Sequence, residues 1–265
     1  MTESATFPAR VADALRRTLP SRLRAAGIHL SISAAIFLAT LYLILVHWYP
    51  GFHFAVDGGW QGVRIMAAVD LVLGPSLTLI IFNPLKARKL IVFDLTCIGL
   101  TQLGALIWGF YAIHSQHPVA VSYYDGSFHS VTSAPLEIEK YDLARLAELS
   151  ERRPALVFVA EPANEEELTR ASMQELMGKV ASHEDPYFFR RFSENWPEVR
   201  LHAVEVASRS KDNTAFAREL PGFLEARGAQ AAGFLYFPYE GRYGSCTLAL
   251  TPGGEPVDAL GCENF

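Results

Sequence analysis

The residues that could carry out chemistry in this sequence are few, and they form no recognised catalytic pattern. Ser182, His183 and Glu184 are consecutive, and residues 123–125 (Tyr-Tyr-Asp) form a second polar run. The sequence contains no GxSxG nucleophile turn, HExxH pair, glycine-rich phosphate loop or CxxC pair. Ser182 and His183 could act as nucleophile and base only if the fold supplied their partners, and a solvated loop is the plainer account. We expect no catalytic residue, no metal site and no cofactor.

The three cysteines differ in their surroundings. Cys246 and Cys262 lie near the C-terminus, whereas Cys97 is alone in an apolar run. In an oxidising compartment the first two can form a disulfide that closes a loop of about 15 residues and stabilises the fold by roughly 3 kcal/mol. Two free thiols remain the alternative, because spacing alone does not establish a bond.

Two carboxylates, Asp70 and Asp94, fall inside apolar runs. An ionisable group in a bilayer costs on the order of 3 kcal/mol, so each is a functional candidate. Asp70 is roughly 9 Å from the outer end of its run and Asp94 is near the inner end of the next, which excludes a shared proton. The basic residues near Asp94 are Lys86, Arg88 and Lys89, and those on the side of Asp70 are His47, His53 and Arg64. We expect Asp94 to form an interfacial ion pair and Asp70 to be the candidate that binds a partner.

The elements that must position these groups are three apolar runs, in a chain that is 50% hydrophobic and 19% charged. Residues 26–46 contain no formal charge, and at about 1.5 Å per residue they cross the roughly 30 Å hydrocarbon core of a bilayer. Residues 65–82 and 90–113 are the second and third predicted spans. A cleaved signal peptide is the alternative for the first, but no small-x-small cleavage site follows it.

The distribution of basic residues predicts the orientation of the spans. Basic residues precede the first span and occupy the turn between the second and third, namely Arg10, Arg16, Arg17, Arg22, Arg24, Lys86, Arg88 and Lys89. The loop from His47 to Val63 contains no Lys or Arg. By the positive-inside rule the N-terminus is cytoplasmic, and this loop and the C-terminal half lie on the outer side of the membrane. Aromatic residues gather at the outer ends of the spans, as expected for a membrane interface.

We therefore divide the chain into a basic cytoplasmic segment (1–25), a three-helix transmembrane domain (26–113) and a small α/β (α+β) domain on the outer side (114–265). From residue 115 onward fourteen Lys and Arg face twenty-three Asp and Glu, which argues against a nucleic-acid partner. Alternation and turn residues predict strands at 118–126, 127–132, 153–162, 231–240 and 244–252, and helices at 142–150, 164–181 and 213–226. Asn164 is the expected N-cap of the middle helix.

Small residues recur at every fourth position on two spans, as Ser31, Ala35 and Ala39 on the first and Cys97, Thr101, Ala105 and Gly109 on the third. Such stripes let helix backbones approach closely. Spans one and three could pack on each other through them, or the stripes could form a groove for a foreign transmembrane helix. Gly74 and Pro75 permit a kink in span two that would open such a groove.

The run from Gly58 to Leu95 and its continuation to Val121 resemble the type IV pilin accessory proteins of the TfpX/TfpZ group. The matching positions are Asp70, Gly74, Pro75, Asn83, Pro84, Lys86, Asp94, Leu95, Gln102, Leu103, His117 and Pro118. About 90 residues carry the resemblance, and the C-terminal part matches only loosely. The resemblance implies a bacterial inner-membrane protein with a role in pilin stability or pilus assembly, whose 114–265 domain is periplasmic. It supplies no catalytic residues.

Three classes of function follow. The first is a non-enzymatic accessory factor, whose helices contact the apolar helix of a membrane-stored pilin or the assembly machinery within the lipid bilayer. The second is a membrane enzyme that acts on lipid or glycan at the periplasmic face, with Asp70, Asp57 or a loop histidine as acid or base. The third, a transporter, would need oligomerisation to enclose a path.

Overall fold

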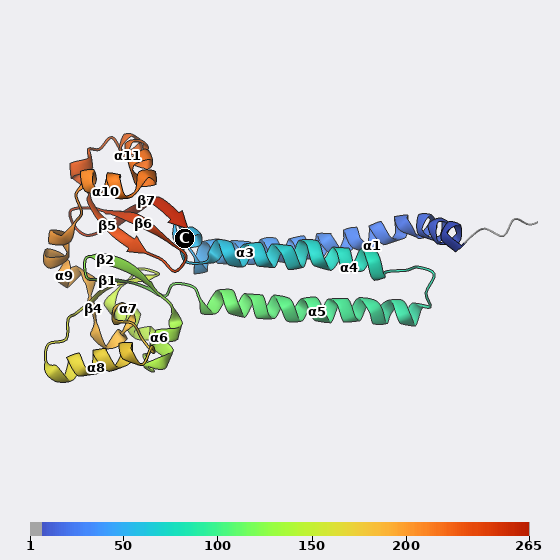
Figure 1. The fold of residues 1–265 in the computed structure, drawn as a ribbon, viewed down its shortest axis with the longest axis horizontal. Helices are drawn as coiled ribbons and strands as arrows, with labels where there is room; N and C mark the ends of the chain where they lie inside the picture. Colours follow the sequence, from blue (N-terminus) through green and yellow to red (C-terminus); the bar gives the residue numbers. More distant parts are fainter. Residues whose placement is uncertain (1–6, 265) are drawn as a thin grey trace, which may run out of the picture. The chain divides into compact units, whose positions relative to one another are not determined.

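The computed structural model describes residues 7–264, with side chains from residue 16 onward (Figure 1). The first part of the predicted basic segment, including the side chain of Arg10, lies outside the described residues. The chain forms two compact units, and each is built from two stretches of sequence. The helical unit runs up to Leu43 and then from Trp60 to Ala112, and the C-terminal unit combines Ile44–Gly59 with the chain from Ile113 onward.

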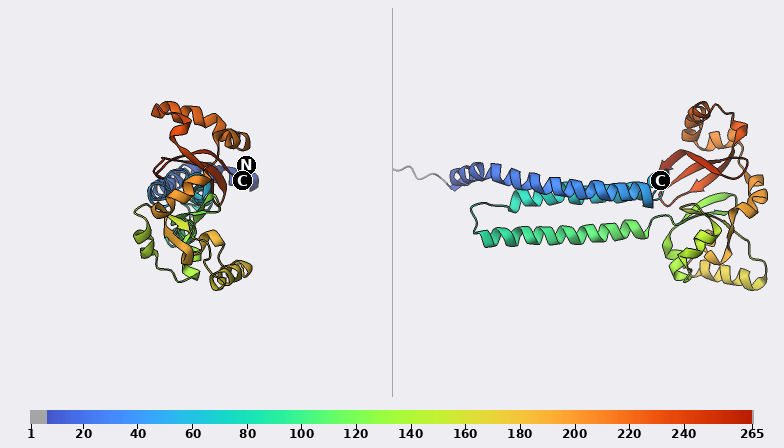
Figure 2. Two further views of the ribbon diagram at one scale, coloured as in Figure 1. Left: turned by 90° about the vertical axis from the view of Figure 1, so that its left-hand side faces the viewer. Right: turned by 180° about the vertical axis from the view of Figure 1, so that it is seen from behind.

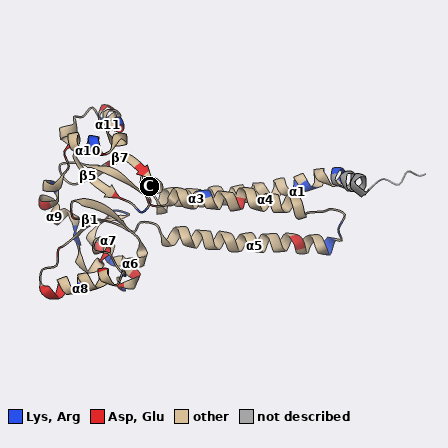
Figure 3. Ribbon diagram, viewed as in Figure 1, with Lys and Arg blue, Asp and Glu red and all other residues tan. Residues whose placement is uncertain are grey.

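Three apolar helical stretches in the described residues are long enough to cross a membrane: Arg16–Trp48, Gly59–Ile81 and Arg88–Ser115. This confirms the three apolar helices predicted from the sequence. The first begins as helix α1 (Phe7–Leu43) and continues as the π-helical turn η1 (Ile44–Trp48). The third is the single helix α5 (Arg88–Ser115). Figure 3 shows how sparsely charged residues occur along α3, α4 and α5.

The second stretch is built from three pieces: α3 (Gly59–Ala67), the π-helical turn η2 (Ala68–Leu73) and α4 (Gly74–Ile81). Pro75 has no N–H to give to a helical hydrogen bond, and it stands in the first turn of α4, where none is needed. The preceding residue, Gly74, donates its N–H to the carbonyl of Val69, five residues back, which closes the wider π turn. The interruption predicted at Gly74-Pro75 is therefore a π turn, and Asp70 lies within it.

Within the helical unit α1 packs along η2 and α4 (Figure 2). Small and hydroxyl side chains at this contact are buried, including Ser33, Thr40 and Thr78. Helix α5 keeps most of its large apolar side chains exposed. In a membrane these side chains would face lipid or another helix, because neither carries a penalty for apolar surface.

The C-terminal unit is built on a seven-stranded mixed sheet with strand order β4-β3-β1-β2-β5-β6-β7. Its strands are β1 (Ala120–Tyr124), β2 (Ser127–Val131), β3 (Ala155–Val159), β4 (Phe189–Arg191), β5 (Leu235–Glu240), β6 (Gly244–Leu250) and β7 (Pro256–Asn264). Its helices are α2 (His53–Val56), α6 (Ser133–Ile138), α7 (Leu146–Leu149), α8 (Glu165–Leu176), α9 (Phe192–Val199), α10 (Val206–Asp212) and α11 (Thr214–Arg227). Strands β1 and β3 pair in parallel, as do β2 and β5, whereas the other neighbours are antiparallel.

Alternate residues of the central strands feed two separate cores. Phe237 of β5 packs with Phe128 and with Trp196 of α9, whereas its neighbour Tyr236 packs with Phe216 of α11. This is the period of two that places successive strand side chains on opposite faces. At β5 the sheet is therefore covered by α9 on one face and by α11 on the other. A further core cluster packs residues of β1 and β3 with Leu136 of α6 and Leu146 of α7.

Several local expectations are confirmed. The β1–β2 hairpin turns at Asp125 and Gly126, and the Asn164 side chain accepts a hydrogen bond from the Glu167 N–H at 2.9 Å. Helix α11 contains Pro221 and ends at the left-handed Gly228. Helix α8 ends at Leu176, earlier than expected, and β4, β7, α6, α9 and α10 were not predicted.

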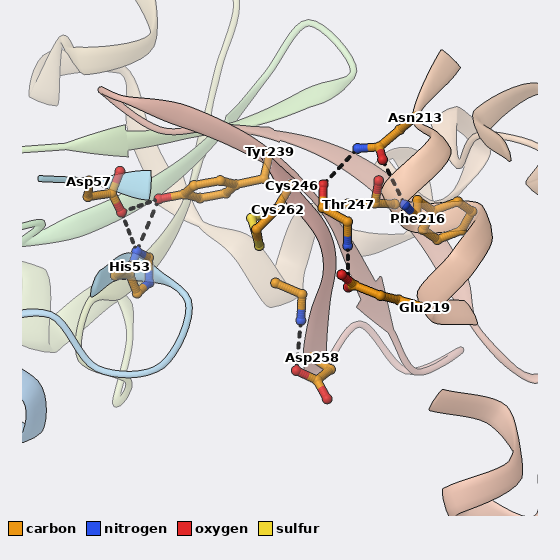
Figure 4. Close-up of a disulfide and its surroundings, with 12 residues drawn as sticks. His53, Asp57, Asn213, Phe216, Glu219, Tyr239, Cys246, Thr247, Asp258 and Cys262 are labelled. Carbon is orange, nitrogen blue, oxygen red and sulfur yellow. Dashed lines mark hydrogen bonds and ion pairs between the residues drawn. A yellow bond between two sulfur atoms is a disulfide. The ribbon is translucent and has the colours of Figure 1, made fainter. Parts of the chain in front are cut away.

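The disulfide between Cys246 and Cys262 is present (Figure 4). It joins the neighbouring antiparallel strands β6 and β7, and Cys246 is completely buried. The pairing predicted from the sequence is confirmed, and Cys97 is free and exposed.

Candidate functional site

A hydrogen-bonded chain of polar side chains joins the three apolar helices inside the helical unit. His29 of α1 has its Nδ1 2.5 Å from the Thr78 hydroxyl of α4, and its Nε2 bonds to Oε1 of Gln102 of α5. Because an amide oxygen only accepts, Nε2 donates to Gln102, and Nδ1 shares a hydrogen bond with the Thr78 hydroxyl. His29 therefore links two other helices.

Gly74 makes room for this chain. A Cβ atom added at Gly74 would lie 1.9 Å from Nε2 of Gln102. No side chain fits there, so glycine lets Gln102 lie against the start of α4 and reach His29. The sequence suggested a kink at Gly74, and the structure adds this close approach.

Asp70 lies beside this chain in a cavity of about 490 Å³ that is lined by residues of all three helices. Its side chain is 6% exposed, and no hydrogen bond or ion pair joins it to a described residue. The other polar groups in the lining are Ser33, His29, Thr78 and Gln102. The cavity thus presents one carboxylate that has no hydrogen bond or ion pair with a described residue, in a lining that is mostly apolar, and a cation would be favoured there.

Two of the partners that the sequence offered to Asp70, Arg64 and His53, make other contacts. The Arg64 guanidinium lies 5.9 Å from the centre of the Trp60 ring, and His53 bonds to Asp57 in the other unit. For Asp94 the expectation is confirmed, since its Oδ2 is 2.5 Å from Nζ of Lys86. Asp94 is therefore in an ion pair, whereas Asp70 has none among the described residues.

The small-residue stripes lie largely outside the internal helix contacts. Six of their members are exposed: Ser31, Ala35, Ala39, Cys97, Thr101 and Ala105. The seventh, Gly109, is half-buried. Spans one and three therefore do not pack on each other through these stripes, because α1 uses the neighbouring face, with Ser33 and Thr40, to pack on span two. The exposed stripes are available to lipid or to another helix.

A second polar cluster lies in the C-terminal unit and consists of His53, Asp57 and Tyr239, all at least 95% buried (Figure 4). Oδ2 of Asp57 is 2.6 Å from Nδ1 of His53 and accepts a hydrogen bond from the Tyr239 hydroxyl at 2.9 Å. Its other oxygen accepts from the backbone N–H of Arg242 at 3.3 Å. Burial and the Asp57 carboxylate raise the pKa of Tyr239 well above its usual range, so the hydroxyl stays a donor.

This cluster ties the loop after span one to the sheet. The carbonyl of Val56 accepts from the Tyr243 N–H at 2.7 Å, and a Cβ atom at Gly241 would lie 2.6 Å from the Asp57 carboxylate. The turn between β5 and β6 therefore closes over α2. The spacing of His53 and Asp57, four residues apart, predicts one helix face, whereas nothing local points to Tyr239.

The sequence fragment Ser182–Glu184 forms a short 3₁₀ turn that is half-buried against β1 and β2, so the expectation of a solvated loop is wrong. The Ser182 hydroxyl donates to Glu175 at 3.0 Å. The ring of His183 stacks on His129 at 4.5 Å between centroids, and burial together with His129 lowers the pKa of His183 to about 4. Among the described residues no group of three or more His, Cys, Asp or Glu is arranged to hold a metal ion.

Three apolar helices with a disulfide-bonded sheet domain define a multi-pass membrane protein that carries a globular unit. The chain belongs to the family of fimbrial assembly proteins. It is 35% identical over 95 residues to the "Fimbrial assembly protein, serogroups C1 and C2" of Dichelobacter nodosus, which covers 36% of this chain and 72% of that protein.

The serogroup E1 and I fimbrial assembly proteins of the same organism are 37% and 35% identical over 95 residues. These matches cover 36% of this chain, and the chain spans only 37% of the length of either relative. No protein-family model and no solved structure matches the chain.

Proposed function

We propose that the protein is a non-enzymatic inner-membrane accessory factor of type IV pilus assembly, which stabilises pilin or promotes its incorporation. Its relatives are named fimbrial assembly proteins, which supports a role in pilus assembly. Their shared segment covers about a third of this chain, so the finer assignment to the TfpX/TfpZ group rests on the residues of spans two and three.

The helical unit contacts the apolar helix of a membrane-stored pilin in this proposal. The observation that carries it is Asp70, which is 6% exposed and unpaired among the described residues in a cavity shared by three helices. A single buried charge costs several kcal/mol unless a partner neutralises it. A cationic group on the incoming helix would do so. The exposed stripe of Ser31, Ala35 and Ala39 gives that helix a surface for close approach.

The C-terminal unit contacts the globular head of the same pilin. It combines the Ile44–Gly59 loop with the chain after Ile113, although two apolar helices lie between them in the sequence. Both stretches must therefore lie on one side of the membrane. This supports the periplasmic placement that the basic residues predict, because a pilin stored in the membrane exposes its head there.

The proposal is tested by substituting Asp70 in the strain that makes the pili. Asn keeps the shape of Asp70 and removes its charge, so Asp70→Asn should leave the protein in the membrane and reduce sheared surface pilin several-fold. Asp94→Asn is the matched control, because Asp94 is already neutralised by Lys86 and lies partly exposed. Immunoblots for this protein, total pilin and surface pilin give the three readings. Normal surface pilin in the Asp70→Asn strain would contradict charge recognition at this site.

The second candidate is a membrane enzyme that acts on lipid or glycan at the periplasmic face. The observation that favours it is the His53–Asp57 pair, in which a carboxylate orients an imidazole as in many general bases. Tyr239→Phe separates the two roles, because it removes one hydroxyl and little volume. If the cluster only anchors the loop, the melting temperature falls and pili are lost only in proportion. Loss of pili at unchanged melting temperature and protein level would favour the enzyme.

A further inference from the structure

A cavity of about 670 Å³ in the C-terminal unit lies where the chain leaves the apolar helices. The end of the first apolar helix, residues 46–48, forms one part of its wall together with Pro50, and residues 117–119, which follow the third helix, form another. The Tyr49 hydroxyl donates to the carbonyl of Ile113 at 3.0 Å. This hydrogen bond links the end of the first apolar helix to the end of the third. The cavity wall is therefore built from the chain segments nearest the membrane.

Aromatic contacts keep this wall close to the last turn of α5. The His114 ring lies 4.9 Å from that of Trp48 and 4.8 Å from that of His117, between centroids, and both of these line the cavity. Nδ1 of His117 donates to the carbonyl of His114, and burial lowers the pKa of His117, so this side chain is a neutral part of the wall. Tryptophan at such a position marks the headgroup level of a bilayer.

Other residues of the lining supply positive charge. Arg152 and Arg153 line the cavity together with one carboxylate, Glu151. Arg152 forms an ion pair with Glu255 outside the lining, whereas Arg153 has no ion-pair partner among the described residues. Leu146, Pro118 and other small apolar residues complete the lining. An exposed guanidinium beside apolar surface suits a phosphate that is attached to a hydrophobic body.

We propose that this cavity binds the phosphate headgroup of an anionic phospholipid from the adjacent membrane leaflet, with Arg153 as its principal contact. The domain has fourteen basic residues against twenty-three acidic ones after residue 114, so an anionic membrane surface would repel it as a whole. A specific lipid contact at the exit of the helices would oppose that repulsion and fix the unit at the surface. The proposal does not depend on the identity of a pilin.

The test uses the full chain purified in a neutral detergent. Phosphatidylglycerol should raise the melting temperature by about 2–4 °C at saturation, and native mass spectrometry should show retained lipid. Arg153→Gln should weaken the apparent affinity roughly tenfold, since it removes a charge-assisted contact. Arg152→Gln should weaken it less, because Arg152 is already paired with Glu255. Arg218→Gln, at an exposed arginine of α11 outside the cavity, should behave like the natural protein.

Two ligand controls identify the source of the phosphate. Phosphatidylcholine, which has the same phosphate but no net charge, should have a weaker effect, and inorganic phosphate should have none. An equal effect of phosphatidylcholine would overturn the anionic preference, and an equal effect of inorganic phosphate would overturn the lipid assignment. Unchanged lipid retention in Arg153→Gln, measured by mass spectrometry on folded protein, would overturn the site itself.

Discussion

At the scale of single residues, Gly74 shows how a backbone position can organise three helices. Only a hydrogen atom fits between its Cα and the Gln102 amide, and Gln102 in turn bonds to His29. Gly74→Ala should therefore displace Gln102, break the polar chain and lower the stability by about 1–3 kcal/mol. Thermal unfolding in detergent measures this. Gly99→Ala and Gly104→Ala are matched controls, because a Cβ at either position meets no atom within 4 Å.

A gain in stability for Gly74→Ala, of the size that helix propensity alone would give, would contradict the close approach. The controls should show a small gain or no change, since both lie inside α5. The comparison separates packing at one site from the general effect of replacing glycine in a helix.

The stacked rings of His183 and His129 predict that the stability of the C-terminal unit depends on pH. The folded pKa of His183 is about 4, below the ordinary 6.5, so the unfolded chain takes up a proton before the folded unit does. The stability contributed by this group is thus complete above pH 6.5 and is lost as the pH falls toward 4. Urea unfolding of the C-terminal unit at pH 7 and pH 5 measures it. His183→Gln should reduce the difference, whereas His202→Gln, at an exposed residue, should leave it unchanged.

The residues of the candidate sites were predictable to different degrees. Asp70 was identifiable because a carboxylate in an apolar run is costly, and Asp94 because three basic residues adjoin it. His29 and Gln102 give the same signal more weakly, since each is polar in an apolar helix. Their contact across 73 residues, and that of Tyr239 with Asp57, depend on tertiary packing. No local sequence pattern predicts such a contact.

At the scale of elements, the disulfide fastens β7 to β6. Strand β7 lies at the edge of the sheet. The carbonyl of its Gly261 accepts a hydrogen bond from the Asn213 side chain, and the Gly261 N–H donates one to the Glu219 carboxylate of α11. Loss of both cysteines of the bond, in Cys246→Ser/Cys262→Ser, should lower the stability of the C-terminal unit by roughly 2–4 kcal/mol. Denaturant unfolding checks this, with Cys97→Ser as the control at an exposed thiol.

Mass spectrometry of the non-reduced, alkylated protein gives an independent reading of the same element. A missing bond would show as alkylation of both Cys246 and Cys262. Alkylation of Cys97 alone is the expected result, because it is the free cysteine of the three.

The elements missed from the sequence share a physical reason. Strand β7 contains Pro256 and Gly261, and its pairing with β6 shifts register twice, so its side chains do not alternate regularly. Strand β4 has three residues, too few for a period of two to be visible. Strands β1, β3, β5 and β6 were found because they are apolar runs bounded by turns, with burial on both faces.

At the scale of the whole molecule, the division of the chain differs from the one drawn from hydropathy. The residues 44–59 were counted with the transmembrane domain, yet they fold with the C-terminal unit through α2 and the His53–Asp57–Tyr239 cluster. Hydropathy predicts whether a segment lies in lipid or in water. It does not predict which loop packs on a sheet that is distant in the sequence. The C-terminal unit therefore cannot be complete without the loop that precedes spans two and three.

Because the C-terminal unit combines the loop after span one with the chain after span three, the topology prediction becomes more specific. The loop and the C-terminus must share one side, and the basic turn between spans two and three must lie on the other. Alkaline phosphatase fused after Phe265 should be active, because the enzyme needs the oxidising periplasm, and a fusion ending at Leu85 in the turn should be inactive. A fluorescent protein that matures only in the cytoplasm should give the opposite pattern at the two sites. An expressed but inactive fusion after Phe265, together with an active fusion at Leu85, would invert the orientation and leave the shared side intact. Activity at both sites would contradict the three-span arrangement itself.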